Sequence, residues 1–344
     1  MEALLKRLSD AHGVSGFEGE VRDIIRDELK GFVDEFIEDR MGNLIAVRRG
    51  SAFSVMIASH MDEIGLMVQF IDDKGFLSFV TIGGWYEPSL PTRRVILHGT
   101  KGPVTGILGS KPPHVMKPED RKKPLELKDM FIDVGAKTAK DVFDLGIEIG
   151  TPVTLDVTAT RLANGRMTGK AFDNRIGVAV LIQVLREMES PHTVYGVFTV
   201  QEEIGLKGAK VAAFRLKPDI AIATDVTIPG DHPGIAMRDA TAEIGKGPVL
   251  SLVNASGRGL IADQRLVRWL RQAGDKNKIP YQLEVGDGGN TDATIIHLEQ
   301  GGIPSIPVSV PTRYIHSSVE MADLEDISNT VKLIVAAMKK KPAF

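Results

Sequence analysis

Two neighbouring glutamates, Glu202 and Glu203, stand directly after an apolar run at residues 194–200 that is typical of a buried strand. An ionised carboxylate is costly to bury without a partner, so this pair needs a cation, and the first basic residue downstream is Lys207. A metal centre would meet the need, with one carboxylate as a ligand and the other as the proton carrier for an activated water. The dipeptide alone leaves open the alternative of a strand end exposed to water.

Further polar side chains follow predicted buried strands or precede a predicted helix. They are His60, Asp62, Asp173, Asp225 and His316. In open α/β sheets, functional side chains gather beyond the carboxyl ends of the strands. Together with the two glutamates, these residues are the donor types of a site for two divalent cations.

Taken singly, each of these residues has a structural explanation. A lone His60 is more often a half-buried histidine, Asp225 a turn residue and His316 a loop histidine. Asp173 could cap the helix expected from residue 176, or bridge two metals about 3.5–4 Å apart. Asp62 points to the same side of an extended segment as His60, so it could orient the imidazole by accepting its second N–H.

Composition limits the class of protein. At 344 residues the chain exceeds the ~250–300 residues of a single core, which predicts two domains. The net charge of −3 gives no basic surface for nucleic acid or an anionic membrane, and no apolar run is long enough to span a bilayer. There is no cysteine, so a metal must be held by His, Asp and Glu. The charged N-terminus does not resemble an export signal, and we expect a cytoplasmic protein with no nucleic-acid or membrane partner.

Two patterns of predicted secondary structure divide the chain. Residues 1–65 and 163–344 alternate strands with helices, which predicts an α/β domain with a mostly parallel sheet covered by helices on both faces. Residues 66–162 show short alternating strands and hairpin turns, which predicts an inserted, small β-barrel-like domain. Within it, residues 111–124 are rich in proline and basic side chains, among them Lys122, and predict a long exposed loop.

The ends of individual helices can also be predicted. The first 37 residues predict two helices, the second of them capped by Ser15, and another helix is expected around residues 260–273.

Six strings occur in order along the chain: SHMDEIG, AFDNR, VQEEIGLKGA, ATDV, GGNTDA and RYIHSSVE. They resemble the tetrahedral (TET) aminopeptidases, the glutamyl-aminopeptidase-like family of dimetal metallopeptidases, and the resemblance extends over essentially the whole chain. It implies metal ligands at His60, Asp173, Glu203, Asp225 and His316. His60 and Asp225 would bind one metal and Glu203 and His316 the other, with Asp173 as the bridge. Glu202 would be the general base, and Asp62 would orient His60.

The resemblance also implies cofactors, substrates and assembly. The cofactors would be two divalent cations per subunit, zinc or cobalt, and the donor types also accept manganese. Substrates would be peptides that enter a hollow homododecamer built from dimers, with the inserted domain as the dimerisation element. Residues 111–124 could then reach a neighbouring active site or line an entry channel. The string PPHVMKPEDRKK in that loop resembles the leucine-preferring branch and favours neutral or hydrophobic N-terminal residues.

Two departures from the family pattern stand near the expected site. Asn174 occupies a position where relatives commonly carry a second aspartate, and Asn290 one where relatives often carry a third glycine. The resemblance leaves a dimetal deacylase of small N-acyl amino acids or peptides as the alternative activity. A glycosidase would need two carboxylates and no metal, and a non-catalytic cage would not need Glu202 or the ligands, which are all present.

Overall fold

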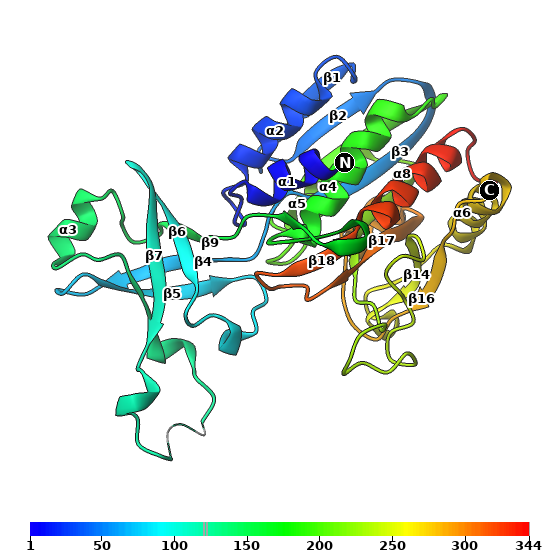
Figure 1. The fold of residues 1–344 in the computed structure, drawn as a ribbon. Coiled ribbons are helices and arrows are strands. Elements are labelled where there is room, and N and C mark those ends of the chain that lie inside the picture. Colours follow the sequence, from blue (N-terminus) through cyan, green and yellow to red (C-terminus); the bar gives the residue numbers. More distant parts are fainter. Residues whose placement is uncertain (120, 122, 344) are drawn as a thin grey trace.

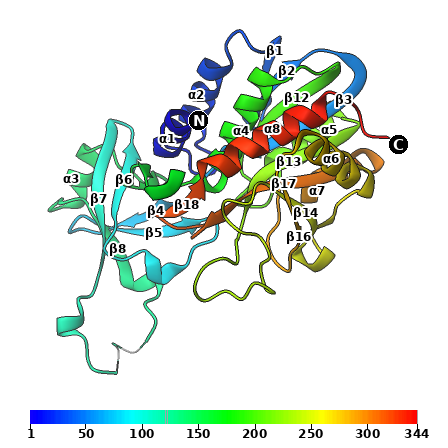
Figure 2. The same cartoon turned by 45° about the vertical axis from the view of Figure 1, so that its right-hand side comes forward.

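The computed structural model describes residues 1–119, 121 and 123–343, so Lys122 of the predicted basic loop lies outside the described residues. Figure 1 shows a larger α/β body that carries both termini and a smaller β domain that extends from one side of it. Figure 2 shows the same division after a turn of the molecule.

The main sheet has a parallel centre and antiparallel flanks. Its central strands run in the order β12, β3, β13, β17, and antiparallel strands continue the sheet on both sides. Alternate residues of β3 belong to two separate hydrophobic cores, with Val55 and Ile57 on one face of the sheet and Met56 and Ala58 on the other. An apolar strand without alternation is therefore buried on both faces. The strands are β1 (Glu35–Glu38), β2 (Leu44–Arg48), β3 (Ser51–His60), β10 (Thr160–Arg161), β11 (Arg166–Gly169), β12 (His192–Thr199), β13 (Ile220–Thr227), β14 (Val249–Asn254), β15 (Leu260–Ile261), β16 (Gln282–Val285), β17 (Ser305–Arg313) and β18 (Glu320–Asp323).

Helices cover both faces of this sheet. The face of the larger core is packed by α1 (Glu2–Asp10), α2 (Gly19–Leu29), α4 (Phe172–Glu187), α6 (Gln264–Asn277) and α8 (Leu324–Met338). The opposite face is packed by α5 (Lys207–Leu216) and α7 (Ala293–Ile296). The contact stripe of α5 consists of Ala209, Ala212 and Ala213, whose small side chains let the helix lie close to the strands. No helix in the described part of the chain is long and apolar enough to cross a membrane.

The smaller domain is a closed barrel with its own core. Its strands close in the order β4-β5-β8-β7-β6-β9. In β5, Leu77 and Phe79 point into the barrel while their neighbours are exposed, which is the alternation that predicted this domain. The elements are β4 (Gly65–Ile71), β5 (Phe76–Ile82), β6 (Arg94–Gly99), β7 (Gly102–Ser110), β8 (Met130–Asp133), α3 (Ala139–Asp144) and β9 (Pro152–Leu155). The predicted α/β fold with an inserted barrel-like domain is confirmed, while the domain boundaries at 65/66 and 162/163 stay a prediction.

The second helix differs from its prediction at both ends. Ser15 does not cap α2, because its hydroxyl donates to the Asp62 carboxylate at 2.6 Å. The helix ends at Leu29 rather than near residue 37. Gly31, two residues after this end, takes a left-handed φ of +82°, and strand β1 follows.

The helix expected around residues 260–273 begins later than predicted. Leu260 and Ile261 form the short strand β15 with β14. Asp263 then caps α6 by accepting a hydrogen bond from the Arg265 amide, so the helix starts at Gln264.

Candidate metal centre

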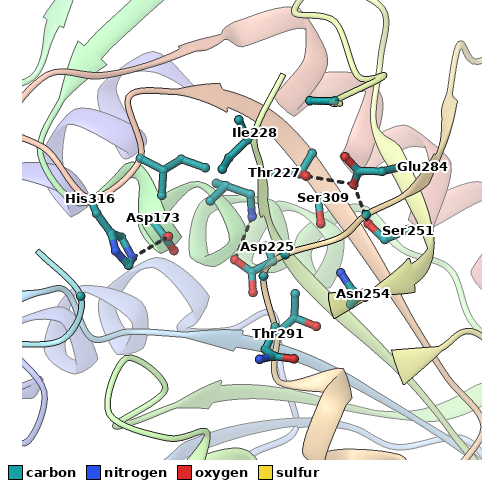
Figure 3. A pocket seen from close by; sticks show the side chains of 18 of the residues that line it. Asp173, Asp225, Thr227, Ile228, Ser251, Asn254, Glu284, Thr291, Ser309 and His316 are labelled. Carbon is teal, nitrogen blue, oxygen red and sulfur yellow. Dashed lines mark hydrogen bonds and ion pairs between the residues drawn. The ribbon is translucent and has the colours of Figure 1, made fainter. Parts of the chain in front are cut away.

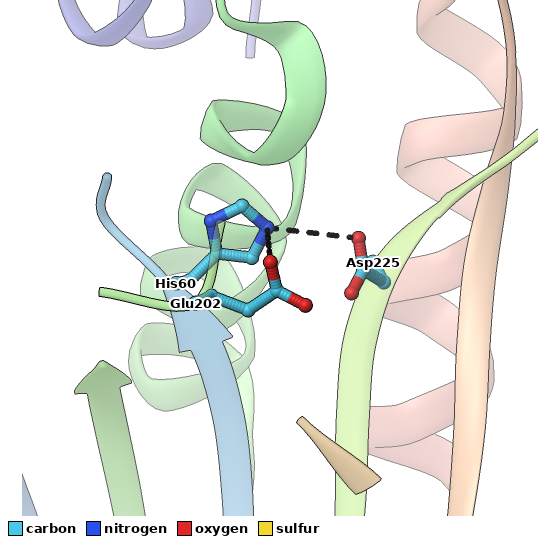
Figure 4. A group of neighbouring side chains, drawn as sticks. All are labelled: His60, Glu202 and Asp225. Carbon is cyan, nitrogen blue, oxygen red and sulfur yellow. Dashed lines mark ion pairs between the residues drawn. The ribbon is translucent and has the colours of Figure 1, made fainter. Parts of the chain in front are cut away.

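The register of the parallel strands brings the candidate residues to one edge of the sheet. Thr199 of β12 pairs with His60, so Glu202 follows β12 beside the end of β3. On the other side Ala58 pairs with Ala223, which places Asp225 level with His60 two residues further along. Figure 4 shows His60, Glu202 and Asp225 converging from three neighbouring segments.

His60 is the centre of the first group of donors. Its Nε2 lies 3.2 Å from Asp173 Oδ1 and 3.9 Å from both Glu202 Oε2 and Asp225 Oδ1. Its Nδ1 lies 3.1 Å from the carbonyl oxygen of Asp62, which can only accept, so Nδ1 carries the proton. Nε2, the ring nitrogen that remains for a cation, faces three carboxylates, which is the orientation of a histidine that binds a metal.

His316 is the centre of the second group. Its Nε2 lies 3.2 Å from Glu203 Oε2. The same nitrogen lies 3.4 Å from Asp173 Oδ2 (Figure 3). Asp173 therefore stands between the two histidines, with one carboxylate oxygen facing each of them.

Electrostatics at this cluster favour bound cations. Burial raises the pKa of Glu202 and of Asp225 well above their ordinary values, and the charge of His60 opposes this only in part. Burial acts against protonation of His316, yet hydrogen bonds to Asp173 and Glu203 raise its pKa to about 11. Four carboxylates, whose side chains are at most 12% exposed, share two imidazoles, and protein groups alone do not balance the charge of all four in the ionised state.

The donor atoms fit two cations. His60, Glu202 and Asp225 offer donors within 4.8 Å of one another, and so do Asp173, Glu203 and His316. Glu203 Oε1 is buried and has no hydrogen-bond partner among the described residues. Nitrogen and carboxylate donors in this arrangement suit zinc, cobalt or manganese.

Asp62 supports the cluster from behind. Its carboxylate accepts hydrogen bonds from the amides of Glu202 at 3.0 Å and Glu203 at 3.2 Å, and from the Ser15 hydroxyl. His60 Nδ1 lies 3.5 Å from the same carboxylate, further away than the Asp62 carbonyl oxygen. Burial alone would raise the pKa of Asp62, but His60 and the other donors lower it, so the group is a charged anchor for both the histidine and the two glutamates.

Two buried carboxylates near the site, Glu320 and Asp292, were not predicted from the sequence. Glu320 accepts hydrogen bonds from the amides of Asp173 at 2.8 Å and His316 at 2.9 Å, so it ties two candidate ligands together. Asp292 accepts from the Thr199 hydroxyl at 2.5 Å, and its Oδ1 has no partner in the described part of the chain. Both residues lie inside the strings RYIHSSVE and GGNTDA, which was the available signal.

Asn174, rather than Asp173, makes the helix-capping contact at the start of α4. Its Oδ1 accepts from the Gly177 amide at 2.9 Å, and its Nδ2 donates to the Thr224 carbonyl at 2.8 Å. A carboxylate in this place would set an acceptor against the Thr224 carbonyl, so the neutral amide suits both partners. Asp173 is thereby left to face the two histidines.

A cavity of about 820 Å³ opens beside the cluster. Figure 3 shows it bounded by the candidate ligands on one side and by Thr227, Ser251 and Glu284 on another. None of the described residues of 111–124 lines it within one chain.

An α/β sheet with an attached barrel and a histidine–carboxylate cluster at the sheet edge is the arrangement that a metal-dependent hydrolase requires. The sequence profile of the M42 glutamyl aminopeptidase family matches residues 42–333, and a shorter profile, AMPT, matches residues 1–25. This chain belongs to the M42 family, and it is an aminopeptidase. The predicted resemblance to the TET aminopeptidases is confirmed.

Similar proteins extend over nearly the whole chain. A TET aminopeptidase from the marine sediment archaeon Thaumarchaeota archaeon SCGC AB-539-E09 is 39% identical with a TM-score of 0.95, covering 99% of this chain and 96% of that one. Aminopeptidase APDkam598 from Desulfurococcus kamchatkensis is 41% identical with a TM-score of 0.95, covering 99% and 95%. The lysyl aminopeptidase of Pyrococcus furiosus is 36% identical, covering 98% and 96%. The TET1 peptidase of Pyrococcus horikoshii, 33% identical with a TM-score of 0.89 and covering 98% and 99%, can assemble into a tetrahedron or a large octahedral shell.

Proposed function

We propose that this aminopeptidase releases the N-terminal residue of peptides with the help of two divalent cations bound at the cluster. The observation that carries the proposal is the position of Asp173, whose two carboxylate oxygens face His60 and His316 separately. A carboxylate in that position can bridge two cations.

The ligands divide evenly around this bridge. His60 and Asp225 would hold one cation, and Glu203 and His316 the other, so that each cation takes one imidazole, one carboxylate of its own and a share of Asp173. Glu202 is the carboxylate left over, although its Oε2 lies only 3.9 Å from His60 Nε2. That surplus supports its role as the proton carrier.

Peptide hydrolysis at this site would need both the bound cations and Glu202 as the proton carrier. When bound, divalent cations lower the pKa of a water molecule and polarise the scissile carbonyl. Glu202 would accept a proton from the attacking water and donate it to the leaving amine. The Asp62 carboxylate would keep Glu202 in place by accepting a hydrogen bond from the Glu202 backbone amide. The Asp62 carbonyl oxygen would keep the proton of His60 on Nδ1, so that Nε2 is the nitrogen that binds the metal.

The finer predictions on cofactor, assembly and location extend this proposal. Zinc or cobalt would be the bound metal, with manganese also compatible with the donors. Each subunit would consist of a catalytic domain (1–65 and 163–344) and the barrel domain (66–162), and contacts between barrel domains would form the dimers of a homododecamer. A solved TET1 dodecamer and the tetrahedral assembly of the TET1 relative support this proposal. A cytoplasmic location stays a prediction.

The choice of activity rests on the relatives, which are aminopeptidases and so favour peptide cleavage over the deacylase alternative. The preference for neutral or hydrophobic N-terminal residues stays a prediction, since the loop on which it rests, residues 111–124, is expected at a neighbouring subunit and has no described member in the cavity lining of one chain.

The test of the proposal is a metal titration with two readouts. Apoprotein refilled with zinc or cobalt should bind two equivalents per chain, and hydrolysis of amino-acid amides should rise with occupancy. An acetylated N-terminus on the same substrate should block hydrolysis. Activity that survives complete chelation, or hydrolysis of the acetylated substrate at the same rate, would refute the proposal.

A further inference from the structure

The cavity beside the candidate ligands contains a second, separate carboxylate. Glu284 of β16 lines the cavity and is only 9% exposed. Its Oε2 accepts hydrogen bonds from the Thr227 hydroxyl at 2.9 Å and the Ser251 hydroxyl at 3.3 Å (Figure 3). Its other oxygen accepts no hydrogen bond from the residues that the structure describes.

Strand geometry fixes the place of Glu284 relative to the ligands. Thr227 lies two residues beyond Asp225 on β13, so the two side chains share a face of the strand about 7 Å apart. Ser251 of β14 pairs with Glu284 of β16 in a parallel register, which brings its hydroxyl against the same carboxylate. Glu284 is therefore positioned about one long side chain away from the candidate metal ligands.

The remaining lining of the cavity includes further polar side chains. Asn254 and Thr291 are more than nine-tenths buried, and each has a side-chain oxygen, Oδ1 and Oγ1, with no hydrogen-bond partner among the described residues. Asp239 and Asp287 add two carboxylates at more exposed parts of the lining. No lysine or arginine is among the described residues that line the cavity.

The ligand that fits this lining has an apolar stem and a donor-rich cationic end. Ile228 and Ile235 provide apolar wall, against which a chain of methylene groups can lie. A lysine ammonium brings three donors and an arginine guanidinium five, and the Glu284 carboxylate can accept from either. An acidic side chain would meet like charges, and a neutral one would leave the Glu284 carboxylate without a cationic partner.

We infer that the cavity receives the side chain of a basic N-terminal residue, lysine or arginine, with its cationic end paired to Glu284. This inference rests on the proposed function and names the substrate class of the same site. Burial raises the pKa of Glu284, and a bound cation would favour its ionised form.

The first experiment compares substrates on the wild-type, metal-loaded enzyme. Chromogenic amides of lysine, arginine, leucine and glutamate are assayed for kcat/KM. Lysine or arginine should exceed leucine by at least about tenfold, and glutamate should be the poorest substrate. Equal or better hydrolysis of leucine or glutamate overturns the inference while the proposed aminopeptidase function stands. A loaded enzyme that hydrolyses none of the amides refutes the proposed function itself.

The second experiment removes the charge and keeps the shape. Glu284→Gln retains an oxygen that can accept from Thr227 and Ser251, so the wall of the cavity is preserved. Loss of one partner of a buried charge pair should lower kcat/KM on the lysine amide by at least about thirtyfold. The value on the leucine amide should change by less than about threefold, whereas a general structural defect would lower both equally.

A matched control separates this local effect from a change in net charge. Glu189→Gln makes the same replacement at an exposed position outside the cavity, and its kcat/KM should match wild type on both amides. An equal loss on lysine and leucine amides in Glu284→Gln, or an unchanged preference for lysine, overturns the inference.

Discussion

Neighbouring glutamates with different roles give the sharpest test of this site. Glu202→Gln keeps the size and polarity of the side chain and removes only its capacity to accept a proton. Three donors, from His60, Asp173 and Asp225, would still surround the nearer cation. The variant should therefore retain both metal equivalents while turnover collapses.

The size of the loss follows from the role. General acid–base catalysis contributes about 10²–10⁴-fold to a rate, and at 1.36 kcal/mol per tenfold this is about 2.7–5.4 kcal/mol of the barrier. Because burial disfavours the ionised Glu202 side chain, its neutral replacement should leave the folded state at least as stable as wild type.

Glu203→Gln is the matched control. Glu203 Oε2 lies 3.2 Å from His316 Nε2, and its loss would remove an anionic donor from the second cation. The affinity of that variant for one of its two metal equivalents should fall. The loss should be at least the roughly 10–100-fold that follows mutation of a residue that only hydrogen-bonds a metal ligand. Metal content after dialysis and hydrolysis of an amino-acid amide would be measured on both variants. Near-wild-type turnover in Glu202→Gln, or loss of a metal there with retention in Glu203→Gln, would show that the roles have been assigned wrongly.

Three further outcomes are expected. Glu63→Gln should lower the free energy of unfolding by about 3–5 kcal/mol, because Lys170 and Arg175 would remain buried without their shared carboxylate; a loss under about 1 kcal/mol in urea denaturation would contradict this. Chelation should lower the melting temperature and zinc should restore it, because the buried carboxylates of the cluster lose their counter-charge; an unchanged melting temperature in the presence of the chelator would argue against bound cations. Burial lowers the pKa of His98 to about 4 from an ordinary 6.5, so the unfolded state binds the extra proton and stability should fall as pH drops from 6.5 toward 4. His98→Gln should make that fall shallower in denaturation measured at each pH, and an equally steep fall would show that other groups cause it.

Much of the fold could be predicted because its signals are local. The apolar run of β3, buried on both faces, and the alternating pattern of β5 distinguish a helix-covered sheet from a barrel. Helix ends were less predictable, since Ser15 and Asp263 are equally good capping residues in the sequence but only Asp263 finds a free amide at a helix start. Ser15 instead serves Asp62, which is distant in sequence.

The candidate ligands could be listed from the sequence because they follow predicted strands and lie inside the six strings, although each of them alone has an ordinary structural explanation. Their partners could not be named in the same way. Glu320 and Asp292 lie inside two of the six strings, but only the folded chain shows that Glu320 accepts hydrogen bonds from the amides of Asp173 and His316. Glu284 is inconspicuous in an alternating strand.

Residue types determined the kind of chemistry available here, because without cysteine only imidazole and carboxylate groups remain to hold a metal. Position was decided by the tertiary structure alone. Parallel pairing sets His60 level with Asp225, and the turn after β17 carries His316 to the far side of Asp173. Distances of a few ångströms between residues more than a hundred positions apart depend on strand register and packing, and these arise only when the whole chain has folded.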